Sequence, residues 1–256
     1  MTPIEYAVDR LQIATLTFNR PAVRNALDWD AMERFARAIR SLDQDAPRAL
    51  ILTGAEGSFC AGGDLPDLHP HATEQDGRRL AELMGQALDQ LERLPFPTLA
   101  AIEGAAVGGG AEIAFACDLR VMAEDASLQM AQVRLGIMPG WGGGQRLLRA
   151  AGYSRAFYWL ATGQPIHASQ ALASGLANEV TPPGKAYTRT FELARDLASY
   201  NPDALKAIKT ALQGGLEKSP AEAMALERSL FPDLWASPAH HQAAEALIEK
   251  LRHADD

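Results

Sequence analysis

The chain has 256 residues, of which 47% are hydrophobic and 22% are charged, and its formal net charge is −8. This composition is that of a soluble globular domain, alone or with a small appendage. The acidic balance argues against nucleic acid and against an anionic membrane surface as partners, because both attract basic faces.

Hydrophobic runs and thiols indicate the compartment. No run approaches the roughly 18 apolar residues of a membrane-spanning helix, and the first residues lack the features of a secretory signal. Cys60 and Cys117 lie far apart without metal-ligand spacing, which favours buried thiols in a reducing compartment over a disulfide. His69 and His71 flank a proline in a polar segment, and metal ligands need fixed positions. We therefore expect a cytoplasmic protein with neither a metal nor a membrane partner.

Strands and helices alternate along the first half of the chain. The strand patterns end in turn residues, and the helix patterns place hydrophobic side chains on one face at helical spacing. The sequence predicts strands over residues 5–8, 13–18, 48–53, 98–103 and 119–122, and helices over residues 28–43 and 78–93. This order predicts an α/β fold.

Two of these strands lead into glycine-rich loops. The first loop contains Ala61, Gly62, Gly63 and Asp64, and the second contains three consecutive glycines, 108–110. Positions 61 and 109 are 48 residues apart, so we interpret strand, loop and helix as a repeated unit.

Glycine-rich loops suggest phosphate binding first, but their spacing argues against it. Neither loop has a Gly-Lys-Ser/Thr ending or the Gly-x-Gly-x-x-Gly pattern with a following acid, and no Gly-x-Ser-x-Gly motif suggests a serine nucleophile. Loops at the ends of two buried strands can instead bring the amides of Ala61 and Gly109 to one carbonyl oxygen, as an oxyanion hole. The alternative is that both glycine runs are tight turns that permit close packing.

Glu112 is a lone acid in the hydrophobic run behind the second loop. Burial there would raise the pKa of its carboxyl toward a value suited to proton transfer. The alternative is a glutamate in the first turn of a helix, stabilised by the helix dipole. Both interpretations place Glu112 at a helix start.

The last quarter of the chain predicts only helices. Three helix starts combine a capping residue with a following proline, at Asn201, Ser219 and Ser237, and Glu222 completes a capping box with Ser219. A short helical unit cannot bury its hydrophobic face alone, so we expect it to pack on its own core and on another subunit. The candidate contact residues, with packing inside the subunit as the alternative, are Leu230, Phe231, Leu234 and Trp235.

Four blocks of the sequence are specific in combination. They are Asn19-Arg20-Pro21 with Asn25-Ala26, Phe59 to Asp64, Gly108 to Glu112, and Leu135-Gly136 through Gln145-Arg146-Leu147. In order and spacing they resemble the enoyl-CoA hydratase/isomerase (crotonase) family over essentially the whole chain. The resemblance implies a spiral of ββα turns forming an acyl-CoA-binding core domain over residues 1–195. It also implies a helical trimerisation domain over residues 196–256 and assembly as a homotrimer or a dimer of trimers.

The resemblance also implies a substrate and a site. An acyl-CoA thioester would place its carbonyl oxygen on the amides of Ala61 and Gly109, and CoA would lie along the loop 61–64. The implied substrate-binding residues are Arg20, Arg24, Ala61, Gly62, Gly63, Asp64 and Gly108. The two arginines are candidates for the CoA phosphates. No separate cofactor is implied, because the substrate carries the CoA.

Position 132 departs from the hydratase pattern of the family. Those hydratases carry two glutamates 20 positions apart, and here Glu112 is followed at that distance by Gln132. An amide orients water but does not accept its proton, so Glu112 would act alone. The single-acid isomerases usually keep the acid at the second position and fit less well. Residues 138–143 resemble the methylmalonyl/ethylmalonyl-CoA decarboxylase branch, whose reaction needs no water activation.

The sequence thus favours an enoyl-CoA hydratase-like lyase that acts through an oxyanion-hole-stabilised enolate, with Glu112 and Gln132 as catalytic residues. Decarboxylation or isomerisation on the same fold is the alternative. A non-catalytic acyl-CoA-binding protein is the alternative from another class, and the retention of Glu112 and both loops argues against it.

Overall fold

The computed structural model describes residues 2–254, leaving aside the side chains of residues 43–45 and 253–254. The chain forms two compact units, one ending at Ala198 and the other beginning at Ser199. The first unit holds all the strands of the described residues, and the second holds helices only.

A six-stranded sheet forms the centre of the first unit. Its strands, in spatial order, are β1 (Ile4–Val8), β2 (Ile13–Phe18), β3 (Ala49–Gly54), β4 (Thr98–Ile102), β6 (Leu119–Ala123) and β9 (Glu179–Thr181). The pair β1–β2 is antiparallel, and the other neighbours are parallel. A parallel sheet needs cover on both faces, which explains why β3 and β4 are mainly hydrophobic and buried almost throughout.

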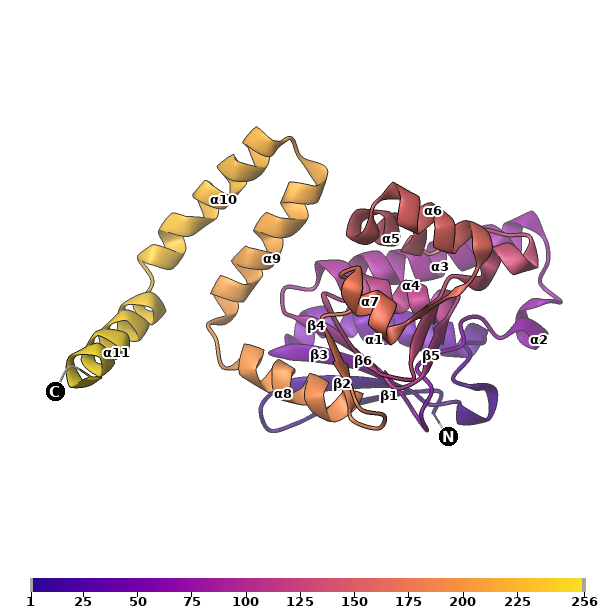
Figure 1. Ribbon diagram of the computed structural model, residues 1–256, viewed down its shortest axis with the longest axis horizontal. Coiled ribbons are helices and arrows are strands. Elements are labelled where there is room, and N and C mark those ends of the chain that lie inside the picture. The colour runs from indigo at the N-terminus through magenta and orange to yellow at the C-terminus, as the bar shows by residue number, and fades with distance from the viewer. Residues whose placement is uncertain (1, 255–256) are drawn as a thin grey trace. The chain divides into compact units, whose positions relative to one another are not determined.

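Helices cover both faces of this sheet (Figure 1). On one face α1 (Trp29–Asp45), α3 (Glu74–Arg93) and α4 (Gly109–Ala116) build the main core, and on the other lies α8 (Ala186–Ala198). Alternate side chains of β3 divide between them, because successive residues of a strand point to opposite faces. Leu50 and Leu52 join the main core, whereas Ile51 packs in the smaller core with Phe191 and Ala194 of α8.

A second, three-stranded sheet lies at the ends of the central strands. It consists of β5 (Ala105–Val107), β7 (Ser127–Gln129) and β8 (Pro165–His167). The remaining elements of this unit are the 3-10 turns η1 (Pro21–Val23) and η2 (Ala131–Leu135) and the helices α2 (Leu65–Leu68), α5 (Gly143–Ala151), α6 (Tyr153–Thr162) and α7 (Ala168–Ala173). A single bridge between Cys60 and Ala106 joins the end of the first glycine-rich loop to β5.

The predicted strands and helices of the first half are confirmed, with differences at their ends. Helix α3 starts at Glu74 rather than at residue 78, because Thr73 and Asp76 form a capping box. The predicted strand 98–103 ends at Ile102, and the separate strand β5 follows after Gly104, whose φ of 120° turns the chain.

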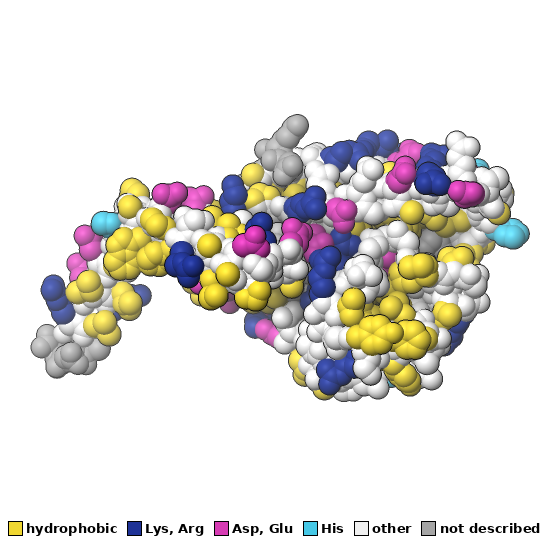
Figure 2. All heavy atoms as spheres, turned by 90° about the horizontal axis from the view of Figure 1, so that it is seen from above, with side chains coloured by type: hydrophobic (Ala, Val, Ile, Leu, Met, Phe, Trp, Pro, Cys, Tyr) yellow, Lys and Arg dark blue, Asp and Glu magenta, His cyan; other side chains and the backbone are white. Residues whose placement is uncertain are grey.

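The second unit contains the three predicted helices, α9 (Pro202–Glu217), α10 (Pro220–Trp235) and α11 (Pro238–Ala254). Asn201 caps α9, and Ser219 with Glu222 forms the predicted capping box of α10. Figure 2 shows hydrophobic side chains gathered on this unit. Its large exposed hydrophobic residues are Ile208, Leu212, Leu216, Met224, Phe231, Trp235, Leu247, Ile248 and Leu251. Across residues 2–254, every helix is too short or too polar to span a membrane.

Candidate active site

The two glycine-rich loops meet beyond the carboxyl ends of the central strands β3 and β4. The Val107 amide donates to the Cys60 carbonyl at 2.9 Å. Gly62 has a φ of 86°, and a Cβ there would stand 2.7 Å from the Val107 oxygen and 2.9 Å from the Gly109 nitrogen. Only glycine allows this approach, because contacts below 3 Å are not tolerated and the conformation is left-handed. The sequence prediction that the two loops come together is confirmed.

A buried asparagine holds the first loop in place. The Asn25 side chain accepts from the Arg20 amide and donates to the carbonyls of Ala55 at 2.9 Å and Ser58 at 2.7 Å. Arg24 and Asn25 both have left-handed φ angles, 53° and 58°, which residues other than glycine rarely adopt. The surrounding hydrogen bonds therefore sustain a strained turn next to the loop.

This turn also accepts a hydrogen bond from one of the two amides predicted to form the oxyanion hole. The Ala61 amide donates to the Arg24 carbonyl at 3.0 Å, so it does not stand free as the sequence suggested. A thioester oxygen must share this amide with Arg24 or displace its carbonyl. Gly109 begins helix α4, where the first amides have no acceptor within the helix. Both residues line the same cavity.

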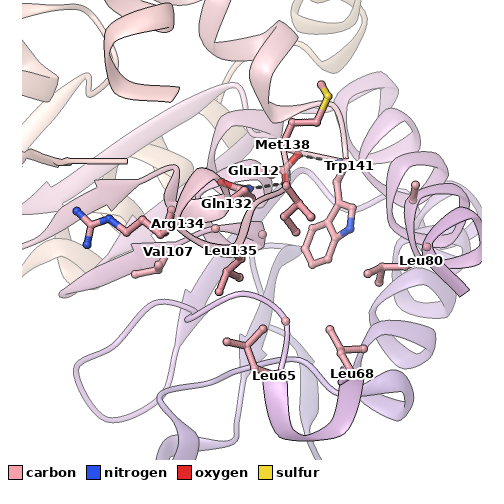
Figure 3. A pocket seen from close by; sticks show the side chains of 18 of the residues that line it. Leu65, Leu68, Leu80, Val107, Glu112, Gln132, Arg134, Leu135, Met138 and Trp141 are labelled. Carbon is pink, nitrogen blue, oxygen red and sulfur yellow. Dashed lines mark hydrogen bonds between the residues drawn. The ribbon is translucent and has the colours of Figure 1, made fainter. Parts of the chain in front are cut away.

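Glu112 lies in the first turn of α4 with only 2% of its surface exposed. Its Oε2 accepts from the amide of Trp141 at 2.9 Å, and its Oε1 accepts from Gln132 Nε2 at 2.9 Å (Figure 3). Oε2 also accepts from the Gly143 amide at 2.8 Å. Burial raises the pKa of this carboxyl, and the hydrogen bonds from Gly143, Trp141 and Gln132 oppose that rise. The predicted desolvated carboxyl with a raised pKa is confirmed.

Gln132 pairs with Glu112 and is one of the residues that line the cavity. Its Nε2 is committed to Glu112, while its Oε1 is buried and has no hydrogen-bond partner within residues 2–254. An unpaired buried acceptor is costly, so such an atom at a cavity wall indicates a place for a donor. A water or a substrate hydroxyl next to Glu112 supplies such a donor.

A cavity of about 470 Å³ adjoins these groups. Figure 3 shows Leu65 and Leu68 of α2 on one side and Glu112 with Trp141 on the other. The hydrophobic side chains that line it are Leu65, Leu68, Leu80, Ala81, Val107, Leu135, Ile137, Met138 and Trp141. The cavity therefore suits an apolar group that ends beside a carboxyl and two loop amides.

The two candidate arginines differ in what they contact. Arg20 forms ion pairs of 2.9 Å with Asp28 and with Asp64 and also donates to a backbone carbonyl. Its guanidinium is thus engaged in holding the 61–64 loop, and its contact with a CoA phosphate stays a prediction. Arg24 is exposed on the strained turn, which makes it the better candidate. Through its ion pair with Arg20, Asp64 helps to anchor the 61–64 loop.

Sequence reasoning missed the amides that bind Glu112. They come from the turn before α5, 29 and 31 positions further along the chain. The glycine cluster around Trp141 was the available signal, because glycines permit such close approach. A Cβ on Gly143 would lie 2.4 Å from Glu112 Cγ, and one on Gly109 would lie 2.0 Å from the Trp141 ring.

Cys60 has a structural part in this site, because its Sγ accepts from the Gly62 amide at 3.4 Å. Cys60 and Cys117 are buried free thiols, and burial raises the pKa of Cys60 to about 12, which keeps it unreactive. Among the described residues no group of three His, Cys, Asp or Glu side chains is arranged to hold a metal ion.

Comparison with known proteins gives consistent results. A family model described as enoyl-CoA hydratase/isomerase matches residues 10–254. The chain is 36% identical to the short-chain-enoyl-CoA hydratase of Clostridium acetobutylicum, over 94% of this chain and 93% of that protein. It is 34% identical to the ethylmalonyl-CoA decarboxylase of Danio rerio, over 94% of this chain and 81% of that protein. The crystal structure of an enoyl-CoA hydratase from Bacillus anthracis matches with a TM-score of 0.92 and 31% identity, covering 97% and 96% of the two chains.

Proposed function

The chain belongs to the enoyl-CoA hydratase/isomerase family, and from this premise we propose that it hydrates a 2-enoyl-CoA thioester with Glu112 as its single acid-base group. The predicted family, enzyme class and α/β crotonase-like fold are confirmed, with a helical C-terminal region. The observation that carries the proposed reaction is the unpaired Oε1 of Gln132 beside the buried carboxylate of Glu112.

The thioester carbonyl binds where the two loops meet. As the β-carbon of the enoyl group is attacked, negative charge develops on the thioester oxygen, and the amides of Gly109 and Ala61 stabilise it. The Ala61 amide turns from the Arg24 carbonyl toward this oxygen or is shared between the two. Removing one such donor in other enzymes lowers the rate about 10²- to 10³-fold.

Water binds beside the hydrogen-bonded pair of Gln132 and Glu112. One O–H donates to Gln132 Oε1, and the other donates to the Glu112 carboxylate, which accepts that proton as the water oxygen bonds to the β-carbon. Glu112 then delivers the proton to the α-carbon, so that H and OH are added across the double bond. The ionised form of Glu112 starts this cycle, so its raised pKa places the acid limb of activity closer to neutrality.

Decarboxylation of a malonyl-type CoA thioester is the second candidate, and Trp141 favours it. The indole packs against Gly109 at the oxyanion position and adds an apolar wall to the cavity. An apolar wall favours loss of carboxylate as CO₂, which leaves the same enolate for Glu112 to protonate. Among the relatives, an ethylmalonyl-CoA decarboxylase supports this candidate. Isomerisation and non-catalytic acyl-CoA binding have no such separate support in the site.

We also propose how CoA is bound, how the chain assembles and in which compartment it acts. The reaction uses the CoA carried by the substrate and no separate cofactor or metal, and the exposed Arg24 binds a CoA phosphate. The hydrophobic surface of the C-terminal helices assembles the chain into a trimer or a dimer of trimers. The protein acts in the cytoplasm, where acyl-CoA thioesters are available and its thiols stay reduced.

A panel of thioesters tests the reaction. The purified protein is mixed with a short 2-enoyl-CoA, and loss of the conjugated-thioester absorbance is followed, in parallel with CO₂ release from methylmalonyl-CoA and ethylmalonyl-CoA. Rapid loss of the absorbance is the expected result. CO₂ release without hydration supports the second candidate, and binding by calorimetry with no turnover of any thioester contradicts both.

A further inference from the structure

We propose that Arg146 is a positioning residue for Glu112, because it fixes the Trp141–Gly143 turn whose amides hold that carboxylate. This inference rests on the proposed function only in taking Glu112 as the acid-base group. Arg146 lies in helix α5, directly after the turn, and its side chain is 5% exposed.

The turn lies between the arginine and the glutamate. On one side its amides donate to Glu112, and on the other Arg146 Nη1 donates to the Trp141 carbonyl at 2.9 Å. A Cβ on Gly142 would lie 2.5 Å from Arg146 Nη1, and a Cβ on Gly143 would lie 2.4 Å from Glu112 Cγ. The two glycines thus let both side chains reach the same stretch of backbone.

The contacts of Arg146 fall on the peptide groups that matter for Glu112. Its guanidinium holds the Trp141 carbonyl, which belongs to the peptide between the two that donate to Glu112. Its own backbone amide donates to the Gly142 carbonyl at 3.2 Å, and the N–H of that same peptide group is the Gly143 amide. Because peptide groups are planar, fixing the Gly142 carbonyl fixes the direction of the Gly143 N–H, and fixing the Trp141 carbonyl holds the peptide that links the two donors.

Carboxylates on another helix fix the guanidinium in turn. Arg146 Nε donates to Glu92 Oε2 at 2.9 Å and Nη2 donates to Asp89 Oδ1 at 2.8 Å, both on α3. Three acceptors around one planar guanidinium leave it little freedom, and lysine can reproduce this arrangement only in part. The positive charge is also neutralised by these two carboxylates, so Arg146 acts on Glu112 through the amides of the turn.

Loosening the turn is expected to raise the pKa of Glu112 further. Burial raises the pKa of Glu112 and the amides counteract it, so a variant with misaligned amides holds the proton more tightly. The ionised form that starts hydration then becomes scarcer at neutral pH. Arg146 makes no hydrogen bond to Ala61 or Gly109, so the main expected effect is on Glu112 rather than on substrate binding.

The test compares Arg146→Met with Arg149→Met. Arg149 is on the same helix and also contacts Glu92, at 3.4 Å, but its side chain is exposed and it is Arg146 that donates to the Trp141 carbonyl. The pKa of Glu112 is measured by infrared titration of its protonated carboxyl band, assigned by the loss of that band in Glu112→Gln. In Arg146→Met we expect the midpoint to rise by about one pH unit and kcat on an enoyl-CoA to fall about 10-fold or more, with KM within about twofold. Arg149→Met should match the wild type, and Arg146→Lys should recover part of the shift.

The outcomes separate this inference from the proposed function. An unchanged infrared midpoint in folded Arg146→Met overturns the positioning role, whatever the activity. If Arg146→Met does not fold, Arg146→Lys keeps the positive charge but not the three-acceptor fork, and a smaller upward shift is expected; no shift there overturns the role. A wild-type protein that turns over no thioester contradicts the proposed function, while the titration still decides the role of Arg146.

Discussion

At the scale of single residues, the proposed catalytic role of Glu112 is combined with a cost in stability. Its carboxylate is buried, and three hydrogen bonds offset only part of the desolvation. A group whose pKa is raised on folding stabilises the fold below its unfolded pKa and loses that contribution as the pH rises through the folded pKa. The active form of this enzyme is therefore the form in which Glu112 destabilises the protein.

Glu112→Gln tests this linkage. The variant keeps an acceptor for the two amides, and Gln132 can turn its amide to pair with the new side chain. We expect a higher Tm than wild type at neutral and alkaline pH and no difference at pH values below the ordinary pKa of glutamate. Thermal unfolding of both proteins across the pH range measures this difference in Tm. A Tm difference that is constant with pH contradicts the raised pKa.

Gln132→Glu tests the role of the amide. Two adjacent carboxyl groups share one proton, so one accepts from water while the other protonates the α-carbon. We expect hydration to accelerate, roughly 10-fold or more, and Gln132→Leu to slow it by removing the acceptor for water. Initial rates on one enoyl-CoA compare the three proteins. A slower Gln132→Glu enzyme would mean that the site uses the amide for something other than orienting water.

The sequence allowed the acid and its partner to be predicted, but not the donors around them. Glu112 and Gln132 stand at a spacing that a family resemblance makes meaningful. The amides of Trp141 and Gly143 carry no side-chain signal, and their meeting with Glu112 depends on how α4 and α5 pack. Likewise, nothing in the residue types predicted that the Ala61 amide bonds the Arg24 carbonyl, because two consecutive left-handed residues arise from tertiary contacts.

At the scale of elements, the approach of the two loops depends on the missing side chain at Gly62. Gly62→Ala places a methyl group 2.9 Å from the Gly109 nitrogen, where the thioester oxygen must bind. We expect kcat to fall about 10²- to 10³-fold. Gly57→Ala is the matched control, since Gly57 also has a left-handed φ, 75°, but lies in open space. Both variants bear a similar backbone strain, so equal losses of activity would contradict the role of the loop contact.

Long elements were predictable and short ones were not. Helices α1 and α3 follow from their hydrophobic spacing, and the central strands from their apolar runs. Strand β5 and helix α2 have only three and four residues, too few for a periodic pattern. They are formed by pairing and packing with distant segments, such as the β5–β7 ladder, and these short elements line the site.

At the scale of the whole molecule, the C-terminal helices expose a hydrophobic surface that a monomer would leave in water. Phe231 and Trp235 are 58% and 59% exposed. If this surface assembles the chain, Phe231→Glu with Trp235→Glu should convert the oligomer to monomers, because charges in a buried interface are costly. Light scattering measures the mass, with Leu11→Glu in the β1–β2 turn as control. An unchanged mass in the double variant, or a wild-type monomer, contradicts the proposed assembly.

The central claim is that Glu112 alone drives addition of water to an enoyl-CoA. The most direct measurement is turnover of a short 2-enoyl-CoA in ¹⁸O-labelled water by wild type and by Glu112→Gln, with the product analysed by mass spectrometry. We predict one labelled oxygen on the β-carbon of the product with wild type, and a rate at least about 10²-fold lower with Glu112→Gln. Equal labelling by both proteins, or none by the wild type at high enzyme concentration, would contradict the account.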